Sequence, residues 1–219
     1  MKALTRGELA RLVAKRLPEN SFVNLGIGLP TMVGDFVSAS QGVMLHSENG
    51  ILNIGPKPPP GHEDFELINA GKTPITLGLG GSYFDTSLSF AMMRGGHLDI
   101  AILGAFQVSQ QGDLANWTTG SDTGAPPAVG GAMDLAVGAK QIWVMMEHVT
   151  KDGEPRIVDA CTFPLTAAAV VNRIFTNVAI IDVTPTGLVI SGLAEGTTVA
   201  EVRAITGAPL SVADAIETI

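Results

Sequence analysis

The sequence predicts an α/β fold with a mostly parallel central sheet, on three observations. Hydrophobic residues make up 46% of the 219 residues and charged residues only 16%, which is typical of a chain with a large core. Segments with strand patterns alternate with segments with helix patterns. Several strand segments are apolar throughout, as in strands buried on both faces. With no internal repeat or linker, residues 1–219 are expected to form one domain.

The first half of the chain predicts a series of strand and helix steps. Thr5 to Glu8 have the spacing of a capping box, and Leu9, Leu12, Val13 and Leu17 then share one helix face. The predicted elements, in order, are a helix at 6–17, a strand entering a glycine-rich turn at 21–28, a helix near 30–39, a strand at 43–49, a loop at 53–66, a strand and turn at 73–82, a helix near 84–94 and a strand at 98–105.

The second half continues the alternation after a long polar loop. Loops of that length are usually functional or mobile. The predicted elements are the loop at 109–128, a helix at 132–139, a strand at 141–147, a "KDGE" turn at 151–154 between two strand segments, a helix at 164–174, a strand pair at 178–191, and a helix at 197–207 that ends on a glycine.

Composition and charge argue against several functional classes. The formal net charge of −8 disfavours nucleic-acid binding through a basic surface. No apolar run approaches the roughly 20 residues that span a bilayer, and the charged start does not resemble a signal peptide. The one cysteine, Cys161, excludes an internal disulfide and favours the cytoplasm. We therefore expect a cytoplasmic protein that binds neither membranes nor nucleic acids.

The usual nucleophile and metal patterns are missing. His46, His62, His97 and His148 are not spaced as metal ligands, so no metal site is expected. No G-x-S-x-G sequence marks a serine nucleophile. Cys161 stands in an apolar context that predicts packed core.

Glu48 is the strongest candidate from the residues alone. The apolar residues 43–45 predict a buried strand, and the end of this strand carries a carboxylate between Ser47 and Asn49. Open α/β sheets bind ligands beyond the carboxyl ends of their strands. An unpaired buried carboxylate is costly and so calls for a reason. We expect a functional role for Glu48, with a capping or salt-bridging glutamate as the alternative.

Two glycine-rich turns are candidate ligand sites. In "NLGIGLP", at 24–30, Gly26 and Gly28 allow a ligand to approach the backbone closely. The dinucleotide fingerprint is incomplete, because Thr31 stands where its third glycine would be. Gly130 and Gly131 directly precede a short helix, where paired amides suit an oxyanion or a phosphate. Each turn is equally compatible with a purely structural role.

A series of stretches resembles the second subunit of the family I CoA-transferases. S-E-N-G, G-D-L-A-N-W and G-G-A-M-D-L are the most specific of them. The matching stretches, in the family's order between about residues 20 and 170, are "NLGIGLPTMV", "LHSENGIL", "LINAGK", "SFAMMRGGHLDIAILGAFQVS", "GDLANW", "VGGAMDLAVGAK", "MEHVTKDGE" and "CTFPLT".

The resemblance implies a three-layer α/β/α sandwich and a set of site residues. Glu48 matches the family's nucleophile, and Gly131 matches the backbone amide of its oxyanion hole, whose second donor is a glutamine of the partner subunit. Lys72 matches a lysine near the bound CoA, where Gly26, Gly28, Asn49 and Gly130 are also expected. One departure is Asn53, where the family usually has glycine or alanine; asparagine also tolerates a left-handed backbone.

The resemblance also implies a reaction. CoA passes from a donor acyl-CoA to an acceptor acid by ping-pong chemistry through a glutamyl-CoA thioester, with CoA as substrate and no permanently bound cofactor. The loop "NWTTGSDTGAPPAVGG" resembles that of the 3-oxoadipate enzymes of aromatic-acid degradation, so succinyl-CoA and 3-oxoadipate are the expected substrates. The alternative acceptor is acetoacetate or another 3-oxo acid. A separate first (alpha) subunit is expected as partner, in an α2β2 assembly.

Three other classes remain as alternatives at this point. A binding-only subunit would leave the chemistry to another chain. An acyl-CoA hydrolase would keep Glu48 but let water finish the reaction. A nicotinamide dehydrogenase would need the glycine pattern that "NLGIGLP" does not complete.

Overall fold

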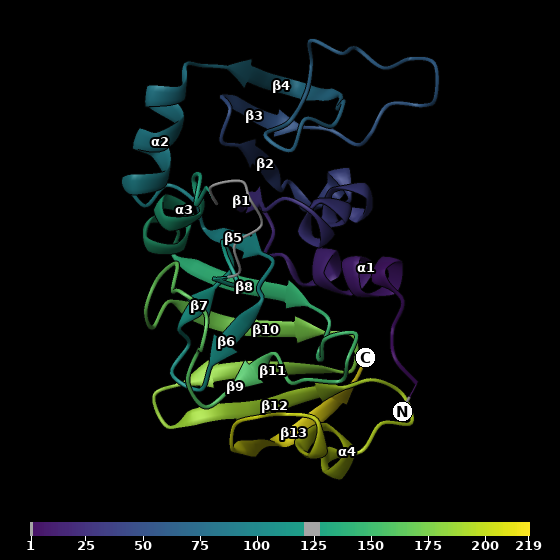
Figure 1. Cartoon of the computed structure of the whole chain (residues 1–219). Helices are drawn as coiled ribbons and strands as arrows, with labels where there is room; N and C mark the ends of the chain where they lie inside the picture. Colours follow the sequence, from purple (N-terminus) through teal and green to yellow (C-terminus); the bar gives the residue numbers. More distant parts are fainter. Residues whose placement is uncertain (1, 121–127) are drawn as a thin grey trace.

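A ten-stranded mixed sheet forms the centre of the protein. The structure is a computed structural model that describes residues 2–120 and 128–219. The order across the sheet is β13-β12-β11-β10-β8-β5-β1-β2-β3-β4 (Figure 1). The strands are β1 (Phe22–Leu25), β2 (Met44–Ser47), β3 (Ile51–Ile54), β4 (Leu77–Tyr83), β5 (Ile100–Leu103), β8 (Gln141–Met146), β10 (Val171–Thr176), β11 (Ala179–Thr184), β12 (Gly187–Leu193) and β13 (Leu210–Thr218).

The middle of the sheet is parallel and buried on both faces. Strands β10, β8, β5, β1 and β2 are all parallel to their neighbours in this run, with Val23 of β1 beside Ile100 of β5. Along β5, Ile100 and Ile102 enter one hydrophobic cluster, while Ala101 and Leu103 enter the other. The prediction of an α/β fold with a mostly parallel sheet is confirmed, since its apolar strands are the doubly buried ones.

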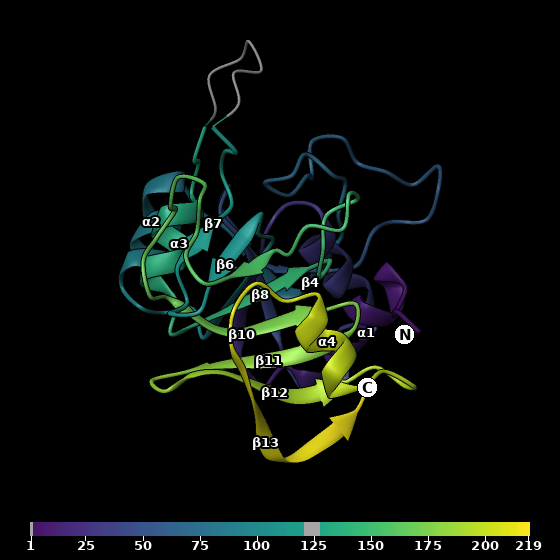
Figure 2. The same cartoon turned by 60° about the horizontal axis from the view of Figure 1, so that its bottom comes forward.

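Helices and a small second sheet cover the two faces of the central sheet (Figures 1 and 2). On one face α1 (Arg6–Arg16) and the 3-10 helix η1 (Leu29–Phe36) pack through Leu9, Val13 and Val33. The other face is covered by α2 (Thr86–Arg94), α3 (Ala132–Gly138), α4 (Val199–Ala204) and the three-stranded sheet of β6 (Gln107–Ser109), β7 (Leu114–Ala115) and β9 (Ile157–Val158). A second 3-10 helix, η2, spans Ala39–Gln41.

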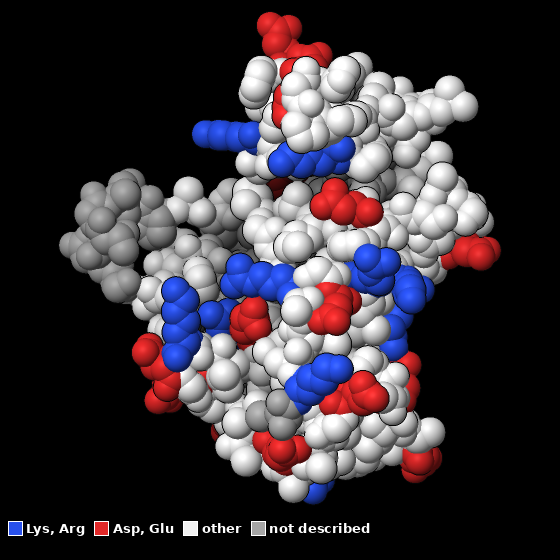
Figure 3. Space-filling view, turned by 90° about the vertical axis from the view of Figure 1, so that its right-hand side faces the viewer, with Lys and Arg blue, Asp and Glu red and all other residues white. Residues whose placement is uncertain are grey.

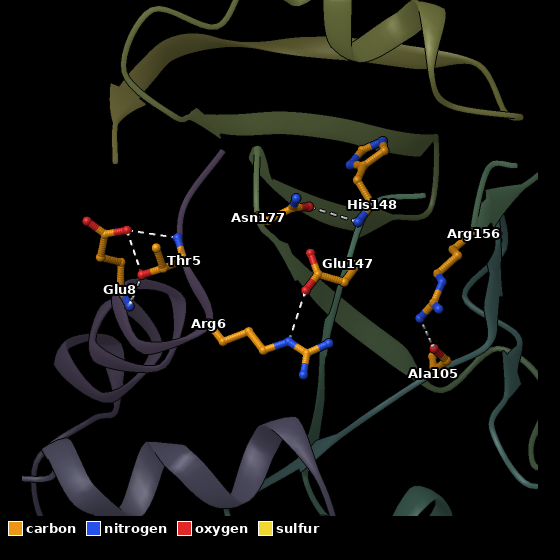
Figure 4. Close-up of polar contacts among 8 residues, drawn as sticks. All are labelled: Thr5, Arg6, Glu8, Ala105, Glu147, His148, Arg156 and Asn177. Carbon is orange, nitrogen blue, oxygen red and sulfur yellow. Dashed lines mark hydrogen bonds and ion pairs between the residues drawn. The ribbon is translucent and has the colours of Figure 1, made fainter. Parts of the chain in front are cut away.

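The start of the chain folds as its sequence predicts. Thr5 caps α1, its side chain accepting from the backbone N–H of Glu8, while the Glu8 carboxylate accepts from the Thr5 N–H at 2.8 Å. Figure 4 shows this capping box at the left. Reciprocal capping satisfies two backbone donors that a helix start otherwise leaves open. It fixes where α1 begins, and therefore where Arg6 lies.

The helix predicted at 164–174 is wrong. Residues 171–176 form β10, which pairs parallel with β8, and residues 164–170 contain no helix. The run of alanines before Val171 gave the helix pattern, but strand pairing determines the conformation of the segment that follows. Pairing across a sheet is a tertiary effect and overrides local propensity.

Other predicted elements are shifted or incomplete. The helix near 30–39 is the shorter 3-10 helix η1, and the two segments around "KDGE" pair only through the bridge of Val149 and Pro155. The loop at 109–128 contains β7, and its residues 121–127 lie outside the described chain. Strand β13 was not predicted at all; its alternation is broken by a register shift against β12.

The surface carries charges of both signs. On the face shown in Figure 3, lysine and arginine groups alternate with aspartate and glutamate groups, and uncharged surface separates them. Among the helices in the described part of the chain, none has the length and hydrophobicity needed to cross a bilayer.

Candidate active site

Glu48 is the first residue of a tight turn between two antiparallel strands. Strand β2 ends at Ser47 and β3 begins at Ile51, so the turn has three residues, Glu48 to Gly50. Gly50 has φ +107°, and a Cβ at this position would overlap with the carbonyl oxygen of Phe84. Only glycine fits this close approach. The turn thus explains the buried strand that ends on a carboxylate: the hairpin presents Glu48 at its tip.

The neighbours of Glu48 hold the turn in place. The Ser47 Oγ accepts from the Ala70 N–H at 3.0 Å, and the Asn49 amide donates to the Ile68 carbonyl at 2.8 Å. The Gly50 N–H donates to the Ser47 carbonyl at 3.0 Å. Ser47, Asn49 and Gly50 therefore each make a hydrogen bond that holds the turn, and the turn places the Glu48 side chain at the cavity.

A cavity of about 510 Å³ opens in front of Glu48. Residues that follow four neighbouring parallel strands line it: Gly26 after β1, Glu48 after β2, Gly104 after β5 and Glu147 after β8. This is the edge at which open α/β sheets bind ligands. The sheet therefore brings together turns that are far apart in the sequence.

Gly131 lies directly against the Glu48 carboxylate. A Cβ built on Gly131 would overlap with Glu48 Oε2 and would lie 3.3 Å from Phe90 Cζ. Gly131 caps α3, and its neighbour Gly130 has a left-handed backbone at φ +56°. Among the described residues, none accepts a hydrogen bond from the Gly131 N–H. A free amide beside a carboxylate is an arrangement that can stabilise negative charge on a reacting oxygen.

The pKa of Glu48 is raised above its ordinary value. Burial is the larger cause, and the nearby charge of Asp134 on α3 is the second. Asp134 is itself paired with Arg94 of α2 at 2.6 Å, and the Arg94 guanidinium lies over the Phe90 ring. Glu48 is thus a half-buried carboxylate that has no counter-ion among residues 2–120 and 128–219, and burying a charge in this way is unfavourable, as the sequence suggested.

His46, two residues before Glu48, is a structural histidine. The Asn24 amide nitrogen lies 3.2 Å from the His46 carbonyl oxygen and 3.0 Å from Nδ1, so Nδ1 accepts. Nε2 then carries the proton and donates to Ser89 Oγ at 3.0 Å. Burial lowers the pKa of His46 to about 4, and the ring stays neutral. Among the described residues that line the Glu48 cavity there is no histidine and no lysine.

The other residues predicted for the site divide into two groups. Gly26 and Gly130 line the cavity, and the Gly26 N–H bonds the Ile102 carbonyl at 2.8 Å. Gly28, Asn49 and Lys72 are not among the described lining residues. Gly28 starts η1 with φ +91°, and Lys72 is an exposed residue with φ +61° in a turn closed on Asn69.

Three charged residues of the cavity were missed by the sequence analysis. Arg6 and Glu147 form an ion pair at 3.3 Å across the cavity edge, and Arg156 reaches toward Ala105 (Figure 4). Glu147 follows a buried strand as Glu48 does, so the same signal could have found it. Arg6 and Arg156 carry no local signal, because only the fold brings a helix start and a loop to this place.

Several further candidates are settled by their surroundings. Asn53 has a left-handed backbone at φ +61°, and its amide donates to the Leu79 carbonyl at 2.9 Å, so it holds β3 to β4. Burial raises the pKa of the Cys161 thiol to about 11, which leaves it a poor nucleophile. No group of three or more acidic, histidine or cysteine side chains within residues 2–120 and 128–219 is arranged to hold a metal ion.

Comparison with known proteins gives a consistent result. The Coenzyme A transferase family matches residues 7–204. The B subunit of the 3-oxoadipate CoA-transferase of Pseudomonas putida is 54% identical over 95% of this chain and 97% of its own. The B subunit of a probable succinyl-CoA:3-ketoacid coenzyme A transferase of Bacillus subtilis is 46% identical over 96% of this chain and 97% of its own. An acyl-CoA transferase of Escherichia coli shares the fold, with a TM-score of 0.75 and 16% identity over 98% of this chain but only 43% of its own.

Proposed function

Because this chain belongs to the coenzyme A transferase family, we propose that its Glu48 takes CoA from a donor thioester and passes it to an acceptor acid. One observation carries the proposal. A half-buried carboxylate without a counter-ion among the described residues projects from a tight turn into a cavity and lies against the backbone of Gly131, whose N–H has no described partner. A carboxylate so placed can attack a carbonyl carbon and become acylated.

The absence of histidine and lysine from the described cavity wall suits this chemistry. An ordinary glutamate with pKa near ~4.3 is ionised at neutral pH and needs no base to become a nucleophile. The raised pKa of Glu48 makes its carboxylate more basic, and so a better nucleophile, provided that it stays ionised at the working pH. A serine or cysteine would need a histidine neighbour, which the described lining residues do not include.

The proposed reaction has four balanced steps. The Glu48 carboxylate attacks the donor thioester, which expels CoA thiolate and leaves an acyl-glutamyl anhydride. The thiolate attacks the glutamyl carbonyl, which releases the donor acid as its carboxylate and forms a glutamyl-CoA thioester. The acceptor carboxylate attacks that thioester and expels the thiolate again. The thiolate then attacks the acceptor's acyl carbonyl, which gives the new acyl-CoA and frees Glu48.

Gly131 is proposed as one donor of the oxyanion hole. Each attack places negative charge on a former carbonyl oxygen, and one preorganised donor is worth roughly 3–4 kcal/mol of transition-state stabilisation. The contact between Gly131 and the Glu48 carboxylate supports this role. Gly26 and Gly130, which line the cavity, are proposed to let the CoA arm approach the backbone. For Gly28, Asn49 and Lys72 a role in CoA binding stays a prediction.

The proposed donor is succinyl-CoA and the proposed acceptor is 3-oxoadipate. The name of the Pseudomonas putida relative supports this choice, at 54% identity. Acetoacetate or another 3-oxo acid is the second candidate, favoured by the Bacillus subtilis relative at 46% identity. A comparison of kcat/KM for 3-oxoadipate and acetoacetate decides between them, and a large preference for acetoacetate would reverse our choice.

The chain is proposed to act together with a separate alpha subunit, in an α2β2 assembly in the cytoplasm. It spans 43% of the Escherichia coli acyl-CoA transferase, and the two relatives of its own length are each named as the B subunit of their enzyme. CoA is proposed to be a substrate, with no cofactor held permanently. Co-purification with the alpha subunit, followed by light scattering, measures the stoichiometry.

The decisive experiment is mass spectrometry of the assembled enzyme after incubation with succinyl-CoA. We expect a CoA adduct on the peptide that contains Glu48, and no adduct in Glu48→Ala. A variant Glu48→Ala that keeps turnover would mean that this chain only shapes the site. Steady CoA release without an acceptor acid would mean that the enzyme is a hydrolase, because water rather than an acid then resolves the adduct.

A further inference from the structure

Arg156 is a cavity residue whose backbone is held by hydrogen bonds but whose guanidinium has no carboxylate partner in the described part of the chain. It follows the "KDGE" turn and precedes β9. Its N–H donates to the His148 carbonyl at 3.2 Å, and its carbonyl accepts from the Val108 N–H at 2.9 Å. The side chain lines the same cavity as Glu48. Two backbone hydrogen bonds therefore fix the point from which the guanidinium enters the cavity.

The guanidinium of Arg156 has little to bind within the described chain. Nη1 donates to the Ala105 carbonyl at 3.4 Å, which is long for a hydrogen bond, and Nε is buried without any partner (Figure 4). The other arginine of the cavity, Arg6, is already paired with Glu147 at 3.3 Å. Burying an arginine without a carboxylate or other acceptors is unfavourable. Its position is explained if a ligand supplies an anion.

The place of Arg156 in the fold limits what that anion can be. Arg156 reaches Ala105, two residues after the end of β5, whereas Glu48 directly follows β2, and only β1 lies between these strands. Two strand spacings correspond to about 10 Å between these strand ends. A span of this order suits a short dicarboxylic acyl chain. The phosphates of CoA are many bonds further from the thioester, and the reacting carboxyl group must lie at Glu48.

We infer that Arg156 binds the distal carboxylate of a dicarboxylic acyl group whose other end reacts at Glu48. This inference rests on the proposed function and deepens it. In ping-pong chemistry donor and acceptor occupy the same cavity in turn, so one arginine serves both. Succinyl-CoA has a free carboxylate at the end opposite its thioester, and 3-oxoadipate has a second carboxylate at the end opposite the reacting one. Acetoacetate has no carboxylate besides the one that reacts. Arg156 therefore selects dicarboxylic substrates, and a planar guanidinium suits a carboxylate in two-point contact.

The test compares Arg156→Gln, Arg156→Lys and Arg6→Gln in the assembled enzyme. The dicarboxylic pair is succinyl-CoA as donor and labelled succinate as acceptor, and the exchange of label is measured. The monocarboxylic pair is acetyl-CoA as donor and acetoacetate as acceptor. We expect Arg156→Gln to lower kcat/KM for the dicarboxylic pair by roughly 10- to 150-fold, mainly through KM, and to spare the monocarboxylic pair. Arg156→Lys should recover part of the loss, because the charge remains.

Arg6→Gln is the matched control, since it removes a cavity arginine that already has a partner. We expect it to change both substrate pairs by the same factor. The inference is overturned if Arg156→Gln lowers kcat/KM equally for both substrate pairs and Arg156→Lys recovers no activity that is specific to the dicarboxylic pair. The melting temperature of Arg156→Lys checks that this variant is folded. The CoA adduct on the Glu48 peptide separates the two proposals: an enzyme that forms the adduct but shows no selective loss refutes only the role of Arg156.

Discussion

The backbone of Gly131 lies so close to the carboxylate of Glu48 that a single added methyl group would overlap with Oε2. This contact joins the tip of the β2–β3 hairpin to the start of α3. It makes a prediction for Gly131→Ala. The backbone angle of Gly131, φ −80°, suits alanine, so the fold should tolerate the change. The Glu48 carboxylate, however, must move.

We expect Gly131→Ala to lower kcat by about 100-fold or more, comparable to the loss of an oxyanion donor. The measurement is steady-state turnover beside a melting curve. Gly7→Ala in α1 is the control, because a Cβ there meets nothing within 4 Å and alanine favours helix. Full activity in Gly131→Ala would refute the proposed contact between this amide and the reacting oxygen.

Replacing Glu48 should stabilise the protein while it abolishes turnover. The pKa of Glu48 is raised in the folded state, chiefly by burial, so its ionisation disfavours folding. The folded chain then holds its proton to higher pH than the unfolded chain, and stability falls as pH rises through this range. Glu48→Gln removes that penalty. At pH 7 we expect Glu48→Gln to have a higher melting temperature than the unsubstituted protein, and at pH 4 we expect this gap to be smaller. A gap of the same size at both pH values would contradict the prediction.

The ion pair of Arg94 and Asp134 should tune the reactivity of Glu48. The Asp134 charge raises the pKa of Glu48, so Asp134→Asn should move the acid limb of the kcat/KM profile to lower pH. Arg94→Gln leaves Asp134 without its partner at 2.6 Å and should move the same limb to higher pH. Opposite shifts in the two pH–rate profiles are the expected result. If both variants shift the acid limb in the same direction, Arg94 and Asp134 affect Glu48 by holding the local structure and not through their charges.

The two buried histidines should make the protein less stable in acid. Burial lowers the pKa of His46 and of His148 to about 4 each, from 6.5. Below about pH 6.5 the two histidines are protonated in the unfolded chain, whereas in the folded chain they stay neutral until about pH 4. Stability present at neutral pH is therefore lost as pH falls, on the order of 3 kcal/mol for each histidine.

Urea unfolding between pH 7 and pH 4.5 measures this effect. His148 bonds Thr176 and Thr206 through its two ring nitrogens, at 3.0 and 2.8 Å. His148→Gln should be less stable at pH 7, because these bonds are weakened, but should lose less stability on acidification. If the free energy of unfolding of His148→Gln falls with pH as steeply as that of the unsubstituted protein, His148 does not contribute to the loss of stability in acid.

Local sequence signals located most of the central elements. The capping box of Thr5 and Glu8 placed α1, and the apolar stretch between Asp99 and Gly104 placed β5, a buried strand of the parallel core. Strong periodicity and short-range hydrogen bonds are properties of neighbouring residues, so the sequence displays them directly. The helix wrongly predicted at 164–174 and the missed β13 are segments whose conformation depends on a distant strand. No window of neighbouring residues contains that information.

By itself the sequence determined that a carboxylate, Glu48, ends a buried strand and that glycines stand before α3. Both are consequences of residue type at a fixed spacing. Only the tertiary structure decided that Gly131 lies against Glu48, that Asp134 raises the pKa of Glu48, and that Arg156 lines the same cavity without a carboxylate partner among the described residues. The physical reason is the parallel sheet, which aligns the carboxyl ends of β1, β2, β5 and β8 at one edge. Residues more than 100 positions apart thereby come into contact range of one ligand.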